Sequence, residues 1–260
     1  MAVEILTGKV FLLITGASQG IGQQIAITFS KLLEKDSRIL LLARNENGLR
    51  ETAGKIPSHV SVECVNVDLS VATADELTGI IEKSVDPSKY DRAVIVHNAG
   101  TIGDISKMTT EMLDFDIWRK YYDLNVFSPA VLNSVFMKIF NDDNKYKKVV
   151  INISSLCGVK PMKSMGYYCS GKAARELYFH VFAEEFPQVN VLNYAPGPVE
   201  TNMLKTVAET AVDVELRKYM SEMRQEKKQL TTDQTVNRLV GILKEQKYKS
   251  GAHVDYFDEI

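Results

Sequence analysis

Residues 10–22, which read V-F-L-L-I-T-G-A-S-Q-G-I-G, decide the fold. Residues 10–14 form a short run of branched and aromatic side chains, which is typical of a buried strand, and a glycine-rich turn follows directly. Residues 21–33 then place apolar side chains at helical spacing. A strand, a glycine turn and a helix in this order predict the phosphate-binding start of an α/β domain.

Three glycines shape this turn, with the spacing G-x-x-x-G-x-G at Gly16, Gly20 and Gly22. Glycine permits a tight turn and lets the backbone approach a pyrophosphate, whose charge faces the helix N-terminus. The alternative is a turn that needs glycine only for packing, and the position between a strand and a helix favours binding. We therefore expect the whole loop to hold a dinucleotide, through Gly16, Ala17, Ser18, Gln19, Gly20, Ile21 and Gly22.

The alternation of strand and helix continues to the end of the chain. Short apolar runs predict further strands at residues 38–43, 60–67, 93–97, 148–154, 189–194 and 252–257, and helical spacing predicts helices at 47–55, 74–83, 114–140 (as one or two helices) and 167–186. Apolar strands joined by helices are typical of a parallel sheet that is buried on both faces. The sequence therefore predicts a single-domain Rossmann-like, doubly wound parallel sheet of about seven strands over residues 1–260.

Composition limits the classes of function. The formal net charge is −2, so no basic surface indicates a nucleic-acid partner. The three cysteines and four histidines lack metal-binding spacing, so we expect no metal, and reduced thiols in a cytoplasmic protein. No apolar run is long enough for a membrane helix, and residues 10–14 are too short for a signal peptide. We therefore expect neither a membrane nor a nucleic acid among the partners.

The loops after the next strands are expected to complete a nucleotide site, because ligands bind at the carboxyl ends of parallel strands. Arg44 lies where an acidic residue would bind the ribose of NAD, and its planar cation suits the 2′-phosphate of NADP. The alternative for Arg44 is a solvated surface arginine. Asp68 is placed either to contact the adenine or to cap a turn. The other residues expected at the cofactor from these loops are Asn45, Leu69, Asn98, Ala99 and Gly100.

The pair Tyr168 and Lys172, in Y-C-S-G-K, predicts the chemistry. Positions four apart lie on one face of a helix, so the phenol and the ammonium would lie close together. A cation beside a phenol favours the phenolate, and we expect Lys172 to lower the pKa of Tyr168 from its usual value of about 10. Such a tyrosine can exchange a proton with a carbonyl or alcohol oxygen. Tyr167 is about 140° from Lys172 around the helix, so we expect it to point elsewhere.

Four motifs in order, T-G-A-S-Q-G-I-G, H-N-A-G, N-I-S-S and Y-C-S-G-K, resemble those of the short-chain dehydrogenase/reductase family over essentially the whole chain. The resemblance implies a carbonyl reductase that uses NADP. It makes Tyr168 the general acid, and Lys172 also a residue that holds the nicotinamide ribose. Ser155, rather than its neighbour Ser154, has the family's spacing to the tyrosine and would hold the substrate carbonyl. Asn125, in Y-D-L-N-V, matches an asparagine that supports a proton-relay water.

The resemblance also covers the segment after P-G-P at residues 196–198. It implies that this segment covers the nicotinamide, through Val199, Glu200, Thr201, Asn202, Met203 and Leu204. Many relatives carry arginine where this chain has Gln19, which leaves Arg44 with more of the discrimination between NADP and NAD. Residues 201–230 are expected to form either a mobile lid or an ordinary helical hairpin.

Within the family, N-I-S-S-L-C-G, Y-Y-C-S-G-K-A-A-R, V-L-N-Y-A-P-G-P and K-S-G-A-H-V-D-Y-F-D resemble segments of members that reduce pterins. This implies NADPH-dependent reduction of the side-chain carbonyls of sepiapterin or 6-pyruvoyl-tetrahydropterin, the final step of tetrahydrobiopterin synthesis. Asp255 matches an aspartate that anchors the pterin, since a carboxylate accepts paired N–H bonds; the alternative is a solvated terminal acid. The substrate is expected to contact Ser155, Leu156, Tyr168, Gly197 and Asp255, in a pocket also walled by Cys157, which packs rather than reacts, and by Met203.

Two other functions stay open. The first is a short-chain reductase for other small ketones, diketones or quinones, which the role of Asp255 would distinguish. The second is a non-catalytic NADP-binding regulatory protein, against which the set Ser155, Tyr168 and Lys172 argues. The resemblance further implies a homodimer that pairs through long helices, including residues 167–186.

Overall fold

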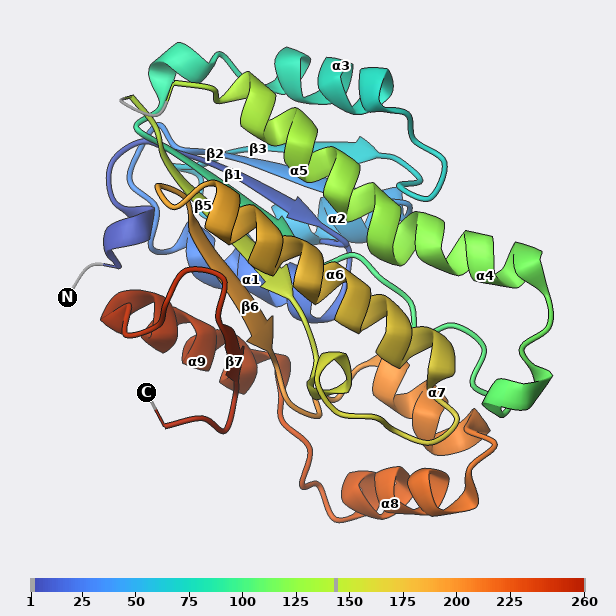
Figure 1. The fold of residues 1–260 in the computed structure, drawn as a ribbon. Coiled ribbons are helices and arrows are strands. Elements are labelled where there is room, and N and C mark those ends of the chain that lie inside the picture. The colour runs from blue at the N-terminus through green and yellow to red at the C-terminus, as the bar shows by residue number, and fades with distance from the viewer. Residues whose placement is uncertain (1–2, 143–144, 260) are drawn as a thin grey trace.

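The centre of the molecule is one sheet of seven parallel strands in the order β3-β2-β1-β4-β5-β6-β7 (Figure 1). The computed structural model describes residues 3–142 and 145–259. The strands are β1 Val10–Thr15, β2 Arg38–Ala43, β3 Ser61–Asn66, β4 Arg92–His97, β5 Lys147–Ile153, β6 Asn190–Ala195 and β7 His253–Asp255. The strand order reverses between β1 and β4, which confirms the doubly wound Rossmann-like sheet and defines where a ligand crevice is expected.

Helices follow the strands along the chain. The α-helices are α1 Gly20–Ser30, α2 Glu46–Ala53, α3 Ala74–Ser84, α4 Phe115–Tyr122, α5 Ser128–Ile139, α6 Gly166–Glu185, α7 Asn202–Thr210, α8 Val214–Gln225 and α9 Thr232–Glu245. Short 3₁₀ turns are η1 Glu4–Leu6, η2 Pro87–Lys89, η3 Thr109–Glu111 and η5 Leu156–Gly158, and the π-helical turn η4 spans Asp123–Phe127.

Two hydrophobic cores lie on opposite faces of the sheet, because successive side chains of a strand point to opposite sides. Leu12 and Ile14 of β1 pack with α1 and α9, whereas Phe11 and Leu13 pack with α3, α5 and α6. In Figure 1, α3, α5 and α6 lie across one face of the sheet and α1 lies beyond it. Both faces are therefore covered, and the carboxyl ends of the strands are left for ligands.

The first helix is shorter than predicted. The first helix, α1, ends at Ser30 rather than at residue 33. Leu33 lies in the following turn, where its N–H donates to the Phe29 carbonyl, and its side chain packs in the same hydrophobic core as α1. The stretch 114–140, expected as one or two helices, forms two helices, which the π-helical turn η4 joins. Such turns insert one extra residue into a helix and are frequent at functional sites.

The seventh strand is shorter than predicted. It ends at Asp255, because the Asp255 N–H donates to the Asp258 carboxylate over 2.8 Å and the Phe257 N–H donates to the Asp255 carboxylate over 3.0 Å. These two bonds turn the chain away from the sheet.

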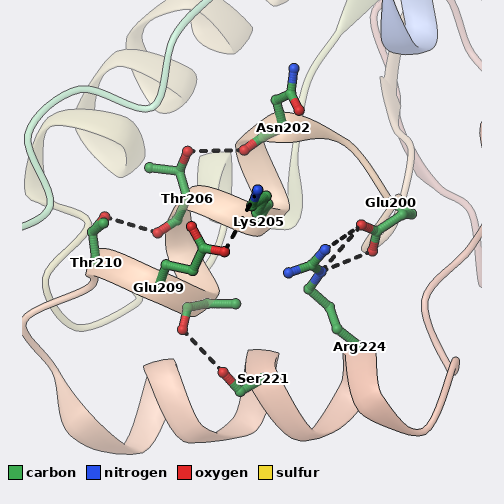
Figure 2. Close-up of polar contacts among 9 residues, drawn as sticks. Glu200, Asn202, Lys205, Thr206, Glu209, Thr210, Ser221 and Arg224 are labelled. Carbon is green, nitrogen blue, oxygen red and sulfur yellow. Dashed lines mark hydrogen bonds and ion pairs between the residues drawn. The ribbon is translucent and has the colours of Figure 1, made fainter.

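Residues 201–230 form the helical hairpin α7–α8 (Figure 2). Arg224 of α8 donates to both carboxylate oxygens of Glu200 over 2.8 to 3.2 Å, and Ser221 donates to the Ala208 carbonyl over 3.0 Å. The hairpin is confirmed, and these bonds tie α8 to the segment that follows β6. Its movement as a lid stays a prediction.

Within the described ranges, no helix is long and apolar enough to cross a membrane. The same ranges hold no cluster of three or more histidine, cysteine, aspartate or glutamate side chains that could bind a metal ion.

Candidate active site

A cavity of about 640 Å³ opens at the carboxyl ends of β1, β2, β3 and β4. This volume is in the range of cofactor sites. Its wall includes most of the residues expected at the cofactor, namely Gly16, Ser18, Gln19, Gly20, Ile21, Arg44, Asn45, Asp68, Leu69, Asn98, Ala99, Gly100, Glu200, Thr201, Asn202 and Met203. The fold thus brings five separate segments of the sequence around one cavity.

Some residues expected at the cofactor lie outside the wall of this cavity, and some residues of the wall were missed. Ala17, Gly22, Val199 and Leu204 are buried in the fold beside the cavity, and Lys172 donates from Nζ to the Ile153 carbonyl over 2.6 Å, so their contacts with a cofactor stay predictions. The missed residues are Gln23, Ala43, Val67, Thr101, Leu124 and Thr232. Several of these directly adjoin predicted positions, whereas Thr232 comes from the start of α9, and no local signal pointed to it.

The glycines of the first loop serve both close approach and packing. Gly16 and Gly20 have φ values of 66° and 60°, which side-chain-bearing residues rarely adopt. A Cβ on Gly22 would lie 2.5 Å from the Gly16 carbonyl oxygen and closer still to Asn98 Nδ2. Asn98 Nδ2 in turn donates to the Thr15 and Gly16 carbonyls over 3.0 and 3.2 Å. The two interpretations of the loop are therefore compatible, since its shape depends on contacts that exclude a side chain.

Arg44 and Asp68 face each other at one edge of the cavity. Arg44 Nη1 lies 3.8 Å from Asp68 Oδ2, and the Arg44 side chain is 64% exposed. Asp68 Oδ1 accepts hydrogen bonds from the Ser70 hydroxyl and N–H, and these bonds, with a smaller contribution from Arg44, lower the Asp68 pKa. Asp68 thus caps its own turn and also holds an accessible guanidinium at the cavity.

Ser155, Tyr168 and Lys172 come together beside the ends of β5 and α6. Ser155 is the N-cap of η5 and accepts a hydrogen bond from the Cys157 N–H over 3.2 Å. Tyr168 and Lys172 lie one turn apart on α6, with Lys172 Nζ 5.6 Å from the centroid of the tyrosine ring. The Ser155 hydroxyl lies near enough to Tyr168 to lower the pKa of its phenol. The three side chains therefore form one group, as the spacing indicated.

The two local alternatives point elsewhere. Ser154 is buried and donates its hydroxyl to Glu176. Tyr167 packs against Trp118, with ring centroids 4.3 Å apart, and against Tyr121. Neither side chain belongs to the group formed by Ser155, Tyr168 and Lys172.

The pKa of Tyr168 is raised, whereas a lowered pKa was predicted, so this prediction is wrong. Burial raises the pKa of Tyr168 above its usual value, and the neighbouring Cys157 adds to this rise, while the nearby Ser155 hydroxyl opposes it. Burial also lowers the pKa of Lys172 well below its usual value, with a further contribution from the charge of Arg175. Both shifts have one main cause, since burial disfavours the charged form of each group.

Asn125 lies in the π-helical turn η4 and is buried. Its side-chain oxygen accepts from the Thr101 N–H over 2.9 Å, and its Nδ2 donates to the Tyr121 carbonyl over 2.8 Å. Asn125 therefore holds the loop that follows β4, next to Gly100, in place. Its role toward a relay water stays a prediction.

The residues expected at the substrate end, Tyr168 of α6 apart, lie at the ends of three neighbouring strands, β5, β6 and β7. Asp255 pairs with Ala195 in the sheet, directly before the turn that contains Gly197, whose φ is 71°. Leu156 is 41% exposed beside Ser155. Within the described residues, Asp255 makes no contact with Tyr168, and the two regions are linked by a hydrogen bond of 2.8 Å between His253 Nδ1 and Glu176.

The cysteines near this site are free. Cys157 is buried beside Tyr168 and packs against Cys169, as expected of a packing residue. The close approach of the two thiols, together with burial, raises the pKa of Cys157, and the neighbouring Cys157 lowers the pKa of Cys169.

The fold and this site define an oxidoreductase that binds a nicotinamide dinucleotide at the switch point of a parallel sheet. The family model described as short chain dehydrogenase matches residues 10–212, and the chain belongs to this family.

Individual proteins of known sequence or structure also resemble this chain. The chain is 35% identical to a sepiapterin reductase of Bos taurus, over 97% of this chain and 96% of that protein. It is 28% identical to a benzil reductase of Bacillus cereus that forms (S)-benzoin, over 93% of this chain and 96% of that protein. A crystal structure of a short-chain dehydrogenase/reductase from Saccharomyces cerevisiae superimposes with a TM-score of 0.80 at 26% identity, covering 96% of this chain and 97% of that one.

Proposed function

We propose that this protein reduces the side-chain carbonyl of a pterin, such as sepiapterin or 6-pyruvoyl-tetrahydropterin, with NADPH, in the final step of tetrahydrobiopterin synthesis. The observation that carries the proposal is the 35% identity to a sepiapterin reductase over 97% of this chain. This similarity extends over both the cofactor cavity and the catalytic group.

The residues of the chain account for the proton half of the reaction. When bound, NADPH supplies a hydride to the carbonyl carbon. The Ser155 hydroxyl donates a hydrogen bond that polarises the carbonyl, and the Tyr168 phenol gives its proton to the same oxygen, so the ketone becomes an alcohol. The raised pKa of Tyr168 suits this direction, because it keeps the phenol protonated at neutral pH. Lys172 holds the ribose, and Asn125 supports the water that returns the proton.

The preference for NADPH rests on Arg44. Its guanidinium is largely exposed at the cavity edge and is oriented by Asp68. A planar cation in this position suits a 2′-phosphate, whereas an acidic residue would suit the free ribose of NAD. Gln19 supplies no second cation, so the margin between the two cofactors depends on Arg44.

The pterin is anchored in this proposal by Asp255. The competing proposal is a reductase for diketones, which the similarity to a benzil reductase favours. The test is NADPH oxidation by the purified protein with sepiapterin beside benzil, a quinone and simple ketones. Turnover of sepiapterin with the highest kcat/KM supports the pterin proposal. A kcat/KM that is higher for benzil, or no turnover of sepiapterin, would overturn it in favour of the diketone reductase.

We further propose a cytoplasmic homodimer. Three free thiols fit a reducing compartment. Exposed apolar side chains on α5 and α6, including Val131, Leu177 and Val181, would be covered by a second copy. Sedimentation of the purified chain distinguishes a dimer from a monomer.

A further inference from the structure

Arg175 is the largest fully buried side chain of the described residues, and it is a cation. Its guanidinium donates from Nε to Asn152 Oδ1 over 2.6 Å, from Nη1 to the Ala99 carbonyl over 3.1 Å, and from Nη2 to the His97 carbonyl. Within residues 3–142 and 145–259, no carboxylate forms an ion pair with it. A buried charge with no counter-ion destabilises a fold relative to an apolar side chain, which indicates a role beyond packing.

The acidic neighbour Glu176 does not neutralise this charge directly. Its two carboxylate oxygens accept hydrogen bonds from Ser154 and from His253 Nδ1, on a different side of the helix. Burial lowers the pKa of Arg175 only to about 10, so the guanidinium stays protonated at neutral pH. Arg175 is thus a permanent charge solvated by neutral oxygens.

The position of Arg175 on α6 places this charge next to the catalytic group. Arg175 follows Lys172 by three residues and Tyr168 by seven, and both spacings return to the same face of a helix. Its partners lie at the other side of the reaction site, because Ala99 belongs to the wall of the cofactor cavity and Asn152 lies near the end of β5.

A row of buried amides extends these contacts across the sheet. Asn152 Nδ2 donates to Asn193 Oδ1 on β6 over 2.8 Å, and Asn193 Nδ2 donates to the Gly251 carbonyl, just before β7, over 2.8 Å. Both asparagines are almost fully buried. Arg175 therefore ends a polar chain that runs from the cofactor loop to the strand that carries Asp255.

We propose that Arg175 is a positioning residue of the reductase site, which fixes the carbonyls of His97 and Ala99 behind the cofactor and supplies a permanent positive charge beside Tyr168 and Lys172. The proposal rests on the proposed reductase chemistry at Tyr168. It adds a second cation to the site, beside that of Lys172.

Two properties follow from the two parts of this role. Removing the charge raises the pKa of both Tyr168 and Lys172, because a nearby cation disfavours the second cation and favours the phenolate. The alkaline limb of the kcat profile, where Lys172 loses the charge with which it holds the ribose, then moves to higher pH. Removing the guanidinium also removes its hydrogen bond to the Ala99 carbonyl. Because Ala99 lies in the wall of the cofactor cavity, this loss should weaken NADPH binding.

Other titratable groups face this site from each element packed on it. They are His97 on β4, Tyr121 on α4, Cys157 on η5, and Cys169 and Glu176 on α6. Burial lowers the His97 pKa to about 3 and raises those of Tyr121 and Cys157, so these three stay neutral near pH 7. Cys169 is the exception, so every profile is repeated in a Cys169→Ser background, where the same shifts are expected.

The test compares Arg175→Met, Arg175→Lys and Asn193→Ser. We measure NADPH affinity by fluorescence at equilibrium, and kcat against pH with the best carbonyl substrate. Arg175→Met is expected to move the alkaline limb up by about one pH unit and to weaken NADPH binding roughly tenfold. Arg175→Lys keeps a cation but lacks the fork of the guanidinium that bonds Asn152 and both loop carbonyls at once, so the limb stays in place while NADPH binding still weakens. Asn193→Ser breaks the amide row without removing a charge and leaves the limb unmoved.

An alkaline limb in Arg175→Met that superimposes on that of the wild type would overturn the electrostatic role. Unchanged NADPH affinity in both Arg175 variants would overturn the loop-holding role. If Arg175→Met does not fold, the folded Arg175→Lys variant decides. An alkaline limb that moves to higher pH in this variant contradicts the electrostatic role, and unchanged NADPH affinity contradicts the loop-holding role. Tyr168→Phe distinguishes a failure of the proposed reductase chemistry from a failure of the proposed role of Arg175. If Tyr168→Phe retains turnover, the reductase chemistry is wrong. If Tyr168→Phe is inactive and the pH profile of Arg175→Met is unchanged, only the role of Arg175 is wrong.

Discussion

The cofactor end and the catalytic end of this site are formed by different parts of the polypeptide. At the cofactor end, the conformation of the main chain determines the shape of the loop: Gly16 and Gly20 adopt positive φ, and Arg44, a cation of the cavity wall, is largely exposed. At the catalytic end, side chains decide: Tyr168 and Lys172 are buried and their pKa values are displaced by that burial. NADPH binding should therefore be sensitive to atoms added at the cofactor end, and turnover should be sensitive to protons and charges removed at the catalytic end.

The largest expected effect is at the catalytic end. Tyr168→Phe keeps the ring but removes the proton, so we expect kcat to fall by about 1,000-fold while NADPH affinity is retained. Tyr167→Phe is the matched control, because the Tyr167 hydroxyl is buried without a partner and its ring packs against Trp118. Steady-state NADPH oxidation measures both. Comparable losses in the two variants would remove the distinction between the tyrosines.

The second largest effect is expected at the cofactor end, where one added methyl group should weaken NADPH binding. Gly22→Ala places a Cβ against the Gly16 carbonyl, so NADPH affinity should fall by about 100-fold. Gly79→Ala in α3 meets no atom within 4 Å and should stabilise the protein by about 0.5–1 kcal/mol. NADPH titration and thermal melting compare the variants. Full NADPH affinity in Gly22→Ala would show that the loop can relax and that packing does not fix its shape.

A charge at the cofactor end should matter less than one at the catalytic end. Arg44→Gln is expected to lower kcat/KM for NADPH about tenfold and to leave that for NADH nearly unchanged, because only NADPH carries the 2′-phosphate. Arg50→Gln removes an exposed arginine that pairs with Glu46 and serves as the control. Equal losses with both cofactors in Arg44→Gln would mean that Arg44 does not read the phosphate.

The smallest effect concerns the link between the catalytic helix and β7. The hydrogen bond with Glu176 is the main cause that raises the His253 pKa, so the charged histidine stabilises the folded state. This contribution is complete below the unfolded pKa, about 6.5, and is lost as pH rises through the folded pKa. The Tm difference between wild type and His253→Gln should therefore be about 2 °C larger at pH 6 than at pH 9. A difference that grows with pH would contradict this sign.

The sequence predicts the cofactor end better than the catalytic end for a physical reason. Glycines between a strand and a helix act locally, so the loop at residues 15–22 and the loops after the next strands could be placed from spacing alone. Tyr168 and Lys172 are also local, one helical turn apart. Arg175 and Glu176 act through partners on other strands, and the net effect of burial on the Tyr168 pKa depends on packing that no local pattern contains. The π-helical turn at Asn125 and the place of Thr232 in the cavity wall likewise depend on tertiary contacts.

The proposed reduction of a pterin depends on the carboxylate of Asp255 as its anchor. The most direct measurement is the ratio of kcat/KM for sepiapterin to that for benzil, in wild type, in Asp255→Asn and in Glu259→Gln, an exposed acid of the same tail. Loss of a charge-assisted pair of hydrogen bonds should lower this ratio by about 100-fold in Asp255→Asn, through sepiapterin alone, and leave it unchanged in Glu259→Gln. A ratio that Asp255→Asn does not change would contradict the claim.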